Sequence, residues 1–312
     1  MPTGIKTTGL LIALSLATAM AQGKTLNGFK ISKPLVSSKL IQRGGPPRDG
    51  IPAIDAPRFI KADKATNPAD TDRVIGLRID GIARAYPIRI LNYHEIVNDR
   101  FAGRPVAITF CPLCGTGIAF DAVVDGVERR FGVSGLLYNS DVLMYDRETE
   151  SLWSQILGKS VNGPSKGQEL KPLPVLHTTW ADWRRRHPDT LVLVEPRFYG
   201  RDYAVDPYLG YANTNDIWFP VAKRDRRYPA KSVVVGAIVD GRAWAWPFAE
   251  LPEGRTALET RAGDTGVILE YDRQTRAARL ADADGEEIPS FTAYWFAWVA
   301  FHPKTEVWTR DR

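Results

Sequence analysis

The stretch Val74-Ile-Gly-Leu-Arg-Ile-Asp-Gly-Ile-Ala-Arg-Ala-Tyr-Pro87 returns 160 residues later as Val234-Val-Gly-Ala-Ile-Val-Asp-Gly-Arg-Ala-Trp-Ala-Trp-Pro247. In both copies an Asp-Gly pair stands between alternating and β-branched residues, which is the pattern of a β-hairpin with a tight turn. Self-similarity of this kind predicts a fold built from repeated units. The hairpin is therefore expected to occur twice.

Two further blocks recur in the same order. Tyr145-Asp-Arg-Glu-Thr149 matches Tyr271-Asp-Arg-Gln-Thr275, and the pattern Trp-x-x-Trp-x-x-x-His-Pro occurs at 180–188 and again at 295–303. Thr178-Thr179 can cap a short helix there, which His-Pro ends before a strand. These blocks predict a β-rich α+β fold of two degenerate halves, each built from hairpins and a short tryptophan-rich helix.

The expected organisation along the chain follows from these blocks and from the N-terminal composition. Leu10 to Ala19 form a short apolar run after Lys6, and Ala19-Met20-Ala21 has the small-x-small pattern of a signal-peptide cleavage site. We expect a signal peptide (1–21), an extended N-terminal arm (22–57), a first half with both cysteines (58–196), a linker (197–229) and a second half without cysteines (230–312).

The N-terminal apolar run and the distribution of charge restrict the classes of partner that we expect. The apolar run is shorter than the roughly 20 residues that a membrane helix needs, so we expect a periplasmic or secreted protein without an integral membrane span. The 312 residues carry a net charge of +5, but the basic residues are dispersed among acids. This argues against nucleic acid as a partner and leaves a small molecule or a metal ion.

The only two cysteines lie in the run Cys111-Pro-Leu-Cys-Gly115. A turn of this kind can hold a soft metal, shuttle a disulfide or close a structural staple. The second half keeps the repeated blocks without any thiol, which argues mildly against a pure staple. A thioredoxin-like site would need a helix after the first cysteine, and the two glycines that follow the pair disfavour one.

The Cys-Pro-x-Cys-Gly pattern resembles the knuckles of rubredoxins and zinc ribbons, although the chain has one knuckle rather than two. The remaining ligands would be histidine, carboxylate or water, and two thiolates with an imidazole suit copper or zinc. His94 shares a predicted helix face with Leu91 and Val97, and the second half lacks it. We therefore predict Cys111, Cys114 and His94 as metal ligands, with a hydrogen-bonded core histidine as the alternative for His94.

Four polar residues are expected in a second shell or at the rim of a cleft. Glu95 adjoins His94, and Asn139 and Asp141 interrupt two apolar runs. Gln155 lies on an expected strand. A base and a solvated residue are alternatives for Glu95, and a plain hairpin turn is the alternative for Asn139 and Asp141. The sequence assigns no catalytic residue.

Four motifs resemble those of a known family: residues 44–53, Cys111-Pro-Leu-Cys-Gly-Thr-Gly117, Gly135-Leu-Leu-Tyr-Asn-Ser-Asp141 and Trp298-Val-Ala-Phe-His-Pro303. With them the chain resembles a domain-of-unknown-function family of exported bacterial and archaeal proteins, over about Gly44 to Trp308. The resemblance implies export and the architecture above, and it carries no activity.

Three functions stay open at this point. The first is an exported protein that binds copper or zinc through the CPLCG knuckle and uses it for redox chemistry on a small molecule. The second is a thiol–disulfide oxidoreductase. The third is a non-catalytic binding module with a Cys111–Cys114 disulfide. No Ser-His-Asp, Walker, dinucleotide or His-Glu-x-x-His motif points to another class of enzyme.

Overall fold

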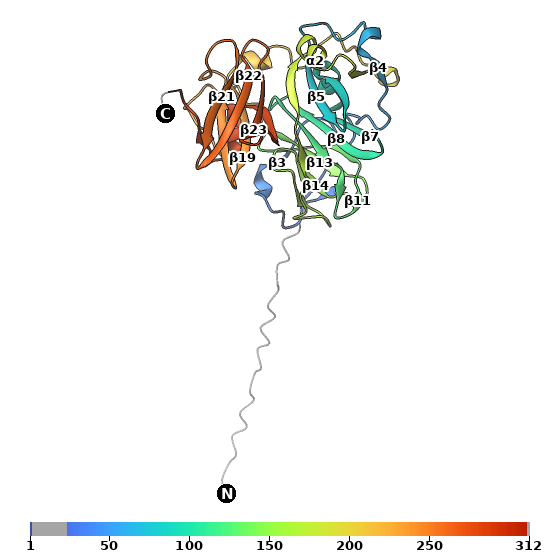
Figure 1. Cartoon of the computed structure of the whole chain (residues 1–312). Coiled ribbons are helices and arrows are strands. Elements are labelled where there is room, and N and C mark those ends of the chain that lie inside the picture. The colour runs from blue at the N-terminus through green and yellow to red at the C-terminus, as the bar shows by residue number, and fades with distance from the viewer. Residues whose placement is uncertain (2–23, 311–312) are drawn as a thin grey trace.

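Five β-sheets of four or five strands each are arranged like the blades of a β-propeller (Figure 1). This computed structural model describes Met1 and residues 24–310, so the predicted signal peptide lies outside the described residues apart from Met1. The described part has three short α-helices: α1 (Ile88–His94), α2 (Trp180–Arg186) and α3 (Trp295–Phe301). Within these residues, none of the helices has the length and apolar character needed to cross a membrane.

The predicted α+β fold of two related halves is wrong, because strands in five blades dominate the molecule. The two copies of the repeated hairpin belong to two separate blades. The residues that follow each hairpin differ in length, and they build blades of their own instead of extending the same unit. The repeated hairpins mark these two blades, and the repeated Tyr-Asp-Arg blocks lie at the ends of β13 (Asp141–Asp146) and β22 (Thr265–Asp272), in two other blades.

Two blades, here called the first and second hairpin blades, have matching strand orders. The first is ordered β17-β5-β6-β18-β4 and the second β25-β19-β20-β26. Val74 pairs with Pro87 in the first hairpin and Val234 with Pro247 in the second. Their strands are β4 (Phe59–Lys61), β5 (Arg73–Ile79), β6 (Ile82–Pro87), β17 (Leu176–Thr179), β18 (Leu191–Leu193), β19 (Val233–Val239), β20 (Arg242–Pro247), β25 (Ser290–Tyr294) and β26 (Glu306–Val307).

Local chemistry explains both hairpins. Asp80 and Gly81 have φ values of 48° and 82°, and Asp240 and Gly241 have 49° and 71°. A two-residue turn of this type needs positive φ at both positions, which Asp and Gly tolerate better than most residues. The Asp-Gly pairs therefore fix the register of each hairpin.

A tryptophan packs on each hairpin at a glycine. A Cβ atom added to Gly76 would lie 2.2 Å from the Trp183 ring, and one added to Gly236 would lie 2.3 Å from the Trp298 ring. Trp183 Nε1 donates a hydrogen bond of 2.8 Å to Thr190. Helix α2 begins after Thr179, whose hydroxyl accepts from the Asp182 N–H. The helix and cap predicted there are confirmed.

Three blades remain, and one of them carries Cys111 at the end of a strand. The cysteine blade is ordered β16-β9-β8-β7, the aspartate blade β15-β14-β13-β12-β3 and the C-terminal blade β21-β22-β23-β24. Their strands are β3 (Ile41–Arg43), β7 (Ile96–Phe101), β8 (Arg104–Cys111), β9 (Thr116–Asp121), β12 (Phe131–Tyr138), β13 (Asp141–Asp146), β14 (Leu152–Ser154), β15 (Lys159–Asn162), β16 (Pro172–Leu173), β21 (Arg255–Ala262), β22 (Thr265–Asp272), β23 (Ala277–Asp282) and β24 (Glu287–Ile288).

Short elements complete the chain. Two two-stranded ribbons pair β1 (Thr25–Leu26) with β2 (Phe29–Lys30) and β10 (Val123–Val124) with β11 (Val127–Glu128). Four 3₁₀ turns are η1 (Ser38–Leu40), η2 (Ala62–Lys64), η3 (Arg197–Tyr199) and η4 (Tyr211–Asn213). The apolar core that contains both cysteines also contains Trp153, Tyr211 and Phe296, so it joins residues from distant parts of the chain.

Candidate metal centre

The two thiols lie in the turn between strands β8 and β9. Cys111 is the last residue of β8, and the Cys114 N–H donates to the Cys111 carbonyl at 3.2 Å. Gly115 has φ 62°, and a Cβ there would lie 3.0 Å from the Tyr294 ring. Tyr294 also donates its N–H to the Cys114 carbonyl at 2.8 Å. The second hairpin blade therefore packs on the turn and limits position 115 to glycine.

Asp141 approaches the thiols from another blade. It begins β13 after a two-residue turn in which Asn139 and Ser140 have φ values of 52° and 67°. Asn tolerates this left-handed conformation, whereas Ser is strained in it. The Ser140 carbonyl accepts from Cys114 Sγ at 3.4 Å and from Cys111 Sγ at 3.9 Å. The strained turn thus sets both Asp141 and a carbonyl oxygen against the sulfurs.

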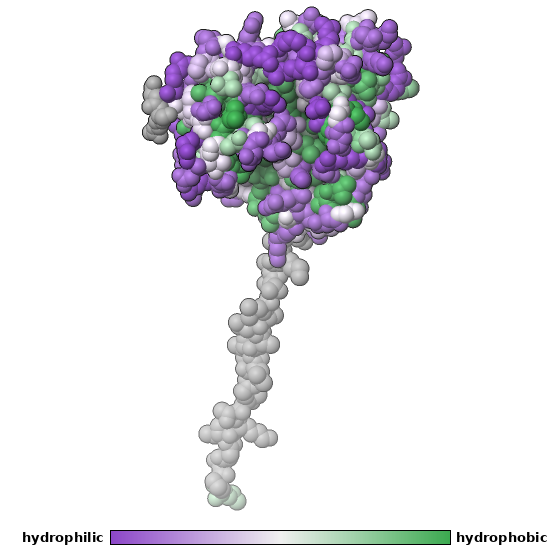
Figure 2. Space-filling model, in the orientation of Figure 1, coloured by the Kyte–Doolittle hydropathy of each residue, from purple (hydrophilic) through white to green (hydrophobic). Residues whose placement is uncertain are grey.

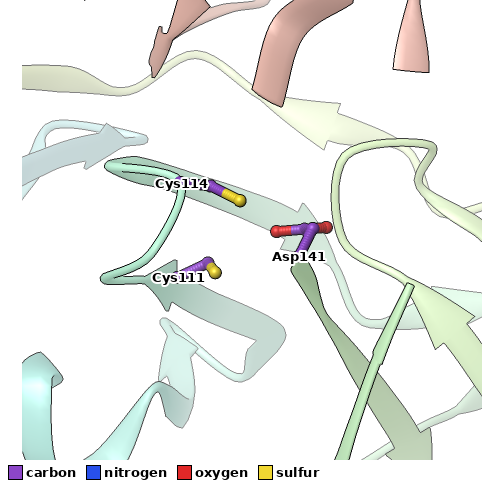
Figure 3. A group of neighbouring side chains, drawn as sticks. All are labelled: Cys111, Cys114 and Asp141. Atoms are coloured by element: carbon purple, nitrogen blue, oxygen red, sulfur yellow. The ribbon is translucent and has the colours of Figure 1, made fainter. Parts of the chain in front are cut away.

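Cys111, Cys114 and Asp141 form a group in which one ligand atom from each lies within 4.8 Å of the others. Figure 3 shows the Cys114 sulfur and the Asp141 carboxylate directed toward one another, with Cys111 on the same turn as Cys114. Two sulfur ligands and one carboxylate oxygen are ligands that zinc sites use. These three side chains could hold a metal ion.

Burial disfavours ionisation of the side chains of Cys111, Cys114 and Asp141. Burial raises the pKa of both thiols, that of Cys114 the more, and Asp141 raises them further. Burial raises the pKa of Asp141 to about 7. Asp141 Oδ2 accepts from the Ile156 N–H at 3.2 Å, while Oδ1 is buried without a hydrogen-bond partner among the described residues. A bound cation would reverse these shifts, because it favours the deprotonated ligands.

Glu95 is a further buried titratable residue, whose carboxylate interacts with that of Asp141. It ends helix α1 with φ 55° and is 7% exposed. Burial, followed by repulsion from Asp141, raises its pKa to about 8.

His94 takes a different place from the one expected. Its Nδ1 lies 2.7 Å from the Pro52 carbonyl and its Nε2 lies 2.6 Å from the Tyr203 hydroxyl. Both ring nitrogens therefore have partners, and His94 lies outside the three-residue group. Asp141 takes the position in that group that the sequence analysis gave to His94. The hydrogen bonds fit the alternative of a core histidine.

Asn139 and Gln155 are buried but make structural contacts. Asn139 donates to the Ala300 carbonyl at 3.0 Å and accepts from the Ala222 N–H at 2.8 Å. Gln155 donates to the Thr109 hydroxyl at 2.9 Å and accepts from the Thr116 hydroxyl at 2.8 Å. These amides tie the aspartate blade to its neighbours.

The segment predicted as a linker covers the thiols, and the sequence analysis missed this. Tyr211 in η4 packs in the same core as the cysteines. The Lys231 ammonium lies 3.2 Å from the centroid of the Tyr211 ring and donates to the Tyr211 carbonyl at 2.9 Å. Lys231 is 8% exposed, and burial lowers its pKa, against smaller raising effects of Asp216 and Cys114. Only the fold brings these residues to the turn, since no motif marks them.

Comparison with known proteins identifies the family. No curated protein and no solved structure matches the chain. One family model, described as "Protein of unknown function (DUF3179)", matches residues 48–305. This range covers most of the sequence and confirms the expected kinship with a domain-of-unknown-function family. The chain therefore belongs to the DUF3179 family.

Proposed function

We propose that this protein is exported and binds one soft transition-metal ion, zinc or copper, through Cys111, Cys114 and Asp141. The observation that carries the proposal is the buried, unpaired Oδ1 of Asp141 in a group with two free thiols. A buried oxygen without a partner is costly, and a cation compensates for it. The apolar run and the Ala19-Met20-Ala21 pattern support export.

Three protein ligands leave a fourth coordination position free, as in catalytic rather than closed structural sites. When bound, zinc would supply Lewis-acid chemistry there, and copper would supply one-electron redox chemistry. The protein's own groups hold the ligands in place: the Ile156 N–H orients Asp141, and the turn at Ser140 directs its carbonyl toward the sulfurs. Tyr211 and Phe296 pack in the same core and limit access of water to the ligands.

The raised thiol pKa values disfavour thiol–disulfide exchange in the metal-free protein. Exchange proceeds through a thiolate, and reactive cysteines usually have lowered pKa values in electropositive surroundings. Burial raises the pKa of both thiols here, so little thiolate is present at neutral pH without a metal. The disulfide-bonded binding module remains the outcome expected if the thiols prove oxidised.

Metal analysis of the full chain purified from the periplasm tests the proposal. We expect about one zinc or copper per chain, and a large loss of bound metal in Cys111→Ser, Cys114→Ser and Asp141→Asn. Asp182→Asn serves as a matched control, because Asp182 is also a buried aspartate but lies on α2 and pairs with Arg186. A folded protein with no metal and no free thiol would overturn the proposal in favour of the disulfide module. Two free thiols that never retain metal would favour exchange.

A further inference from the structure

An apolar cavity of about 260 Å³ lies between the cysteine blade and the second hairpin blade. Its wall includes Phe120, Ile156, Leu170, Ile238, Phe291 and Trp298. The cavity is larger than an engineered apolar cavity of about 150 Å³ that binds benzene. It therefore has room for one or two fused rings.

A second cavity of about 280 Å³ occupies the equivalent place on the first hairpin blade. Gly76, Trp183 and His187 line it, as Trp298 and His302 line the apolar cavity beside the Gly236 strand. Four of its other lining residues are charged, namely Arg78, Arg186, Arg279 and Glu287, and three are apolar, namely Pro174, Val175 and Leu176. The same scaffold thus carries one polar cavity and one apolar cavity.

One pair of equivalent residues marks the difference between the cavities. Arg78 pairs across its hairpin with Ala83, and Ile238 pairs across its own with Ala243, so the two occupy the same register position. Ile238 is 50% exposed at this position. Isolated exposed apolar residues are ordinary, but one at the rim of an apolar cavity is typical of a binding site.

We propose that the cavity beside Trp298 binds an uncharged, apolar small molecule of one or two rings. Among the described residues, no lysine, arginine, aspartate or glutamate lines the cavity, so none of them compensates for a charge on the ligand. Among the described residues of the wall, His302 is the one titratable side chain, and it packs against Trp298 with the rings tilted and 4.2 Å between the ring centroids. Burial lowers the pKa of His302 to about 4, so it offers a neutral imidazole to the ligand at pH 7.

The cavity adjoins the candidate metal centre. Ile156 lines the cavity, and its N–H donates to Asp141 Oδ2. Ile118 and Phe120 also line it and follow Cys114 along strand β9. If the proposed function holds, a ligand in the cavity contacts the residue that orients Asp141. This coupling rests on the proposed function, whereas binding in the cavity does not.

Titration with indole, followed by ligand-observed NMR and calorimetry, tests the proposal. We expect binding at about 1 mM or tighter, a reasonable affinity for a ligand of this size. Ile238→Arg places a guanidinium where the first hairpin blade has Arg78, and the site is half exposed, so folding should survive. We expect this variant to weaken indole binding at least about tenfold. Arg78→Ile, the reverse change at the equivalent position, should leave indole binding unchanged.

The titration is repeated on metal-loaded and chelator-treated protein, so that the two proposals fail separately. Indole binding without any metal in either preparation would overturn the proposed function and leave the cavity proposal standing. Absence of indole binding to both preparations would overturn the cavity proposal, as would equal binding to the wild type and Ile238→Arg. Indole-3-acetate should bind more weakly than indole, and equal affinity would also count against an uncharged ligand.

Discussion

The Ile156 N–H donates to Asp141 Oδ2 at 3.2 Å, and this bond leaves Oδ1 without a donor among the described residues. One oxygen of the carboxylate is thus fixed to the backbone, and the other is available beside two thiols. Burial disfavours the ionised form of this carboxylate, and a bound cation would favour it. The hydrogen bond from Ile156 therefore holds Asp141 with its second carboxylate oxygen free to act as a metal ligand.

The first prediction concerns Asp141→Asn in metal-free protein. The folded-state pKa of Asp141 is raised from 3.8 to about 7, so the folded state binds the proton more tightly than the unfolded state. Its stability contribution is therefore fully present below about pH 4 and is lost as the pH rises through 7. Chelator-treated wild type should lose up to about 4 kcal/mol more than the variant between pH 4 and pH 8. Urea unfolding measures both.

Asparagine can keep the bond to the Ile156 N–H, so the variant removes the charge and little else. Titrating groups distant from Asp141 contribute equally to both proteins and cancel in the difference, whereas the variant also removes the charge that raises the pKa of Glu95. Parallel stability curves for wild type and variant across this range would show that Asp141 is already ionised in the folded protein.

The second prediction is that metal binding releases protons. Both thiols have raised pKa values and are protonated at pH 7, and Asp141 is close to half protonated. All three must lose their protons to act as ligands. Calorimetric titration with zinc at pH 7 in buffers of different ionisation enthalpy should give about two to three protons released per ion. A value near zero would mean that the ion binds elsewhere.

Local features of the chain could be predicted from the sequence because adjacent residues determine them. The Asp-Gly turns and the Thr179 cap each depend on one or two side chains and their own backbone. The kinship of the chain with a family of unknown function could likewise be recognised from the sequence. The division into five blades was not, because the pairing of distant strands leaves no mark at a single position.

The composition of the candidate site shows the same limit. Asp141 was expected at a rim, and the turn at Ser140 instead brings it into a group with the thiols. His94 has the residue type of a ligand, but Tyr203 and Pro52 engage its two nitrogens from distant segments. Lys231 lies far along the chain from Cys114. Ligand type can be read from a sequence, whereas the third ligand depends on how blades pack.

The third prediction concerns strain at the turn that places Asp141. Ser140 has φ 67° and its buried hydroxyl has no hydrogen-bond partner among the described residues. Glycine adopts this conformation without a steric cost. Ser140→Gly should therefore raise the free energy of unfolding by about 1 kcal/mol. Ser160→Gly, in strand β15, should lower it, because glycine weakens a regular strand. Denaturant midpoints of the two variants provide the measurement, and a loss of stability in Ser140→Gly would exclude strain there.

The last prediction concerns acid sensitivity at His177, which joins three blades. Its Nε2 donates to the Gly117 carbonyl at 2.9 Å, and its Nδ1 accepts from the Thr292 hydroxyl at 2.7 Å. Burial lowers its pKa from 6.5 to about 4, so the unfolded state binds the proton more tightly. The stability contribution is present above pH 6.5 and is lost as the pH falls toward 4, by about 3 kcal/mol.

His177→Gln removes this titration and should be less stable than the wild type at pH 7, because an amide replaces the ring imperfectly. The difference between the two proteins should shrink by about 3 kcal/mol between pH 7 and pH 4. The thermal or urea unfolding of both proteins at the two pH values measures the change. His302 titrates in the same direction in both proteins and cancels in the comparison. A difference that stays constant with pH would mean that folding does not lower the pKa of His177.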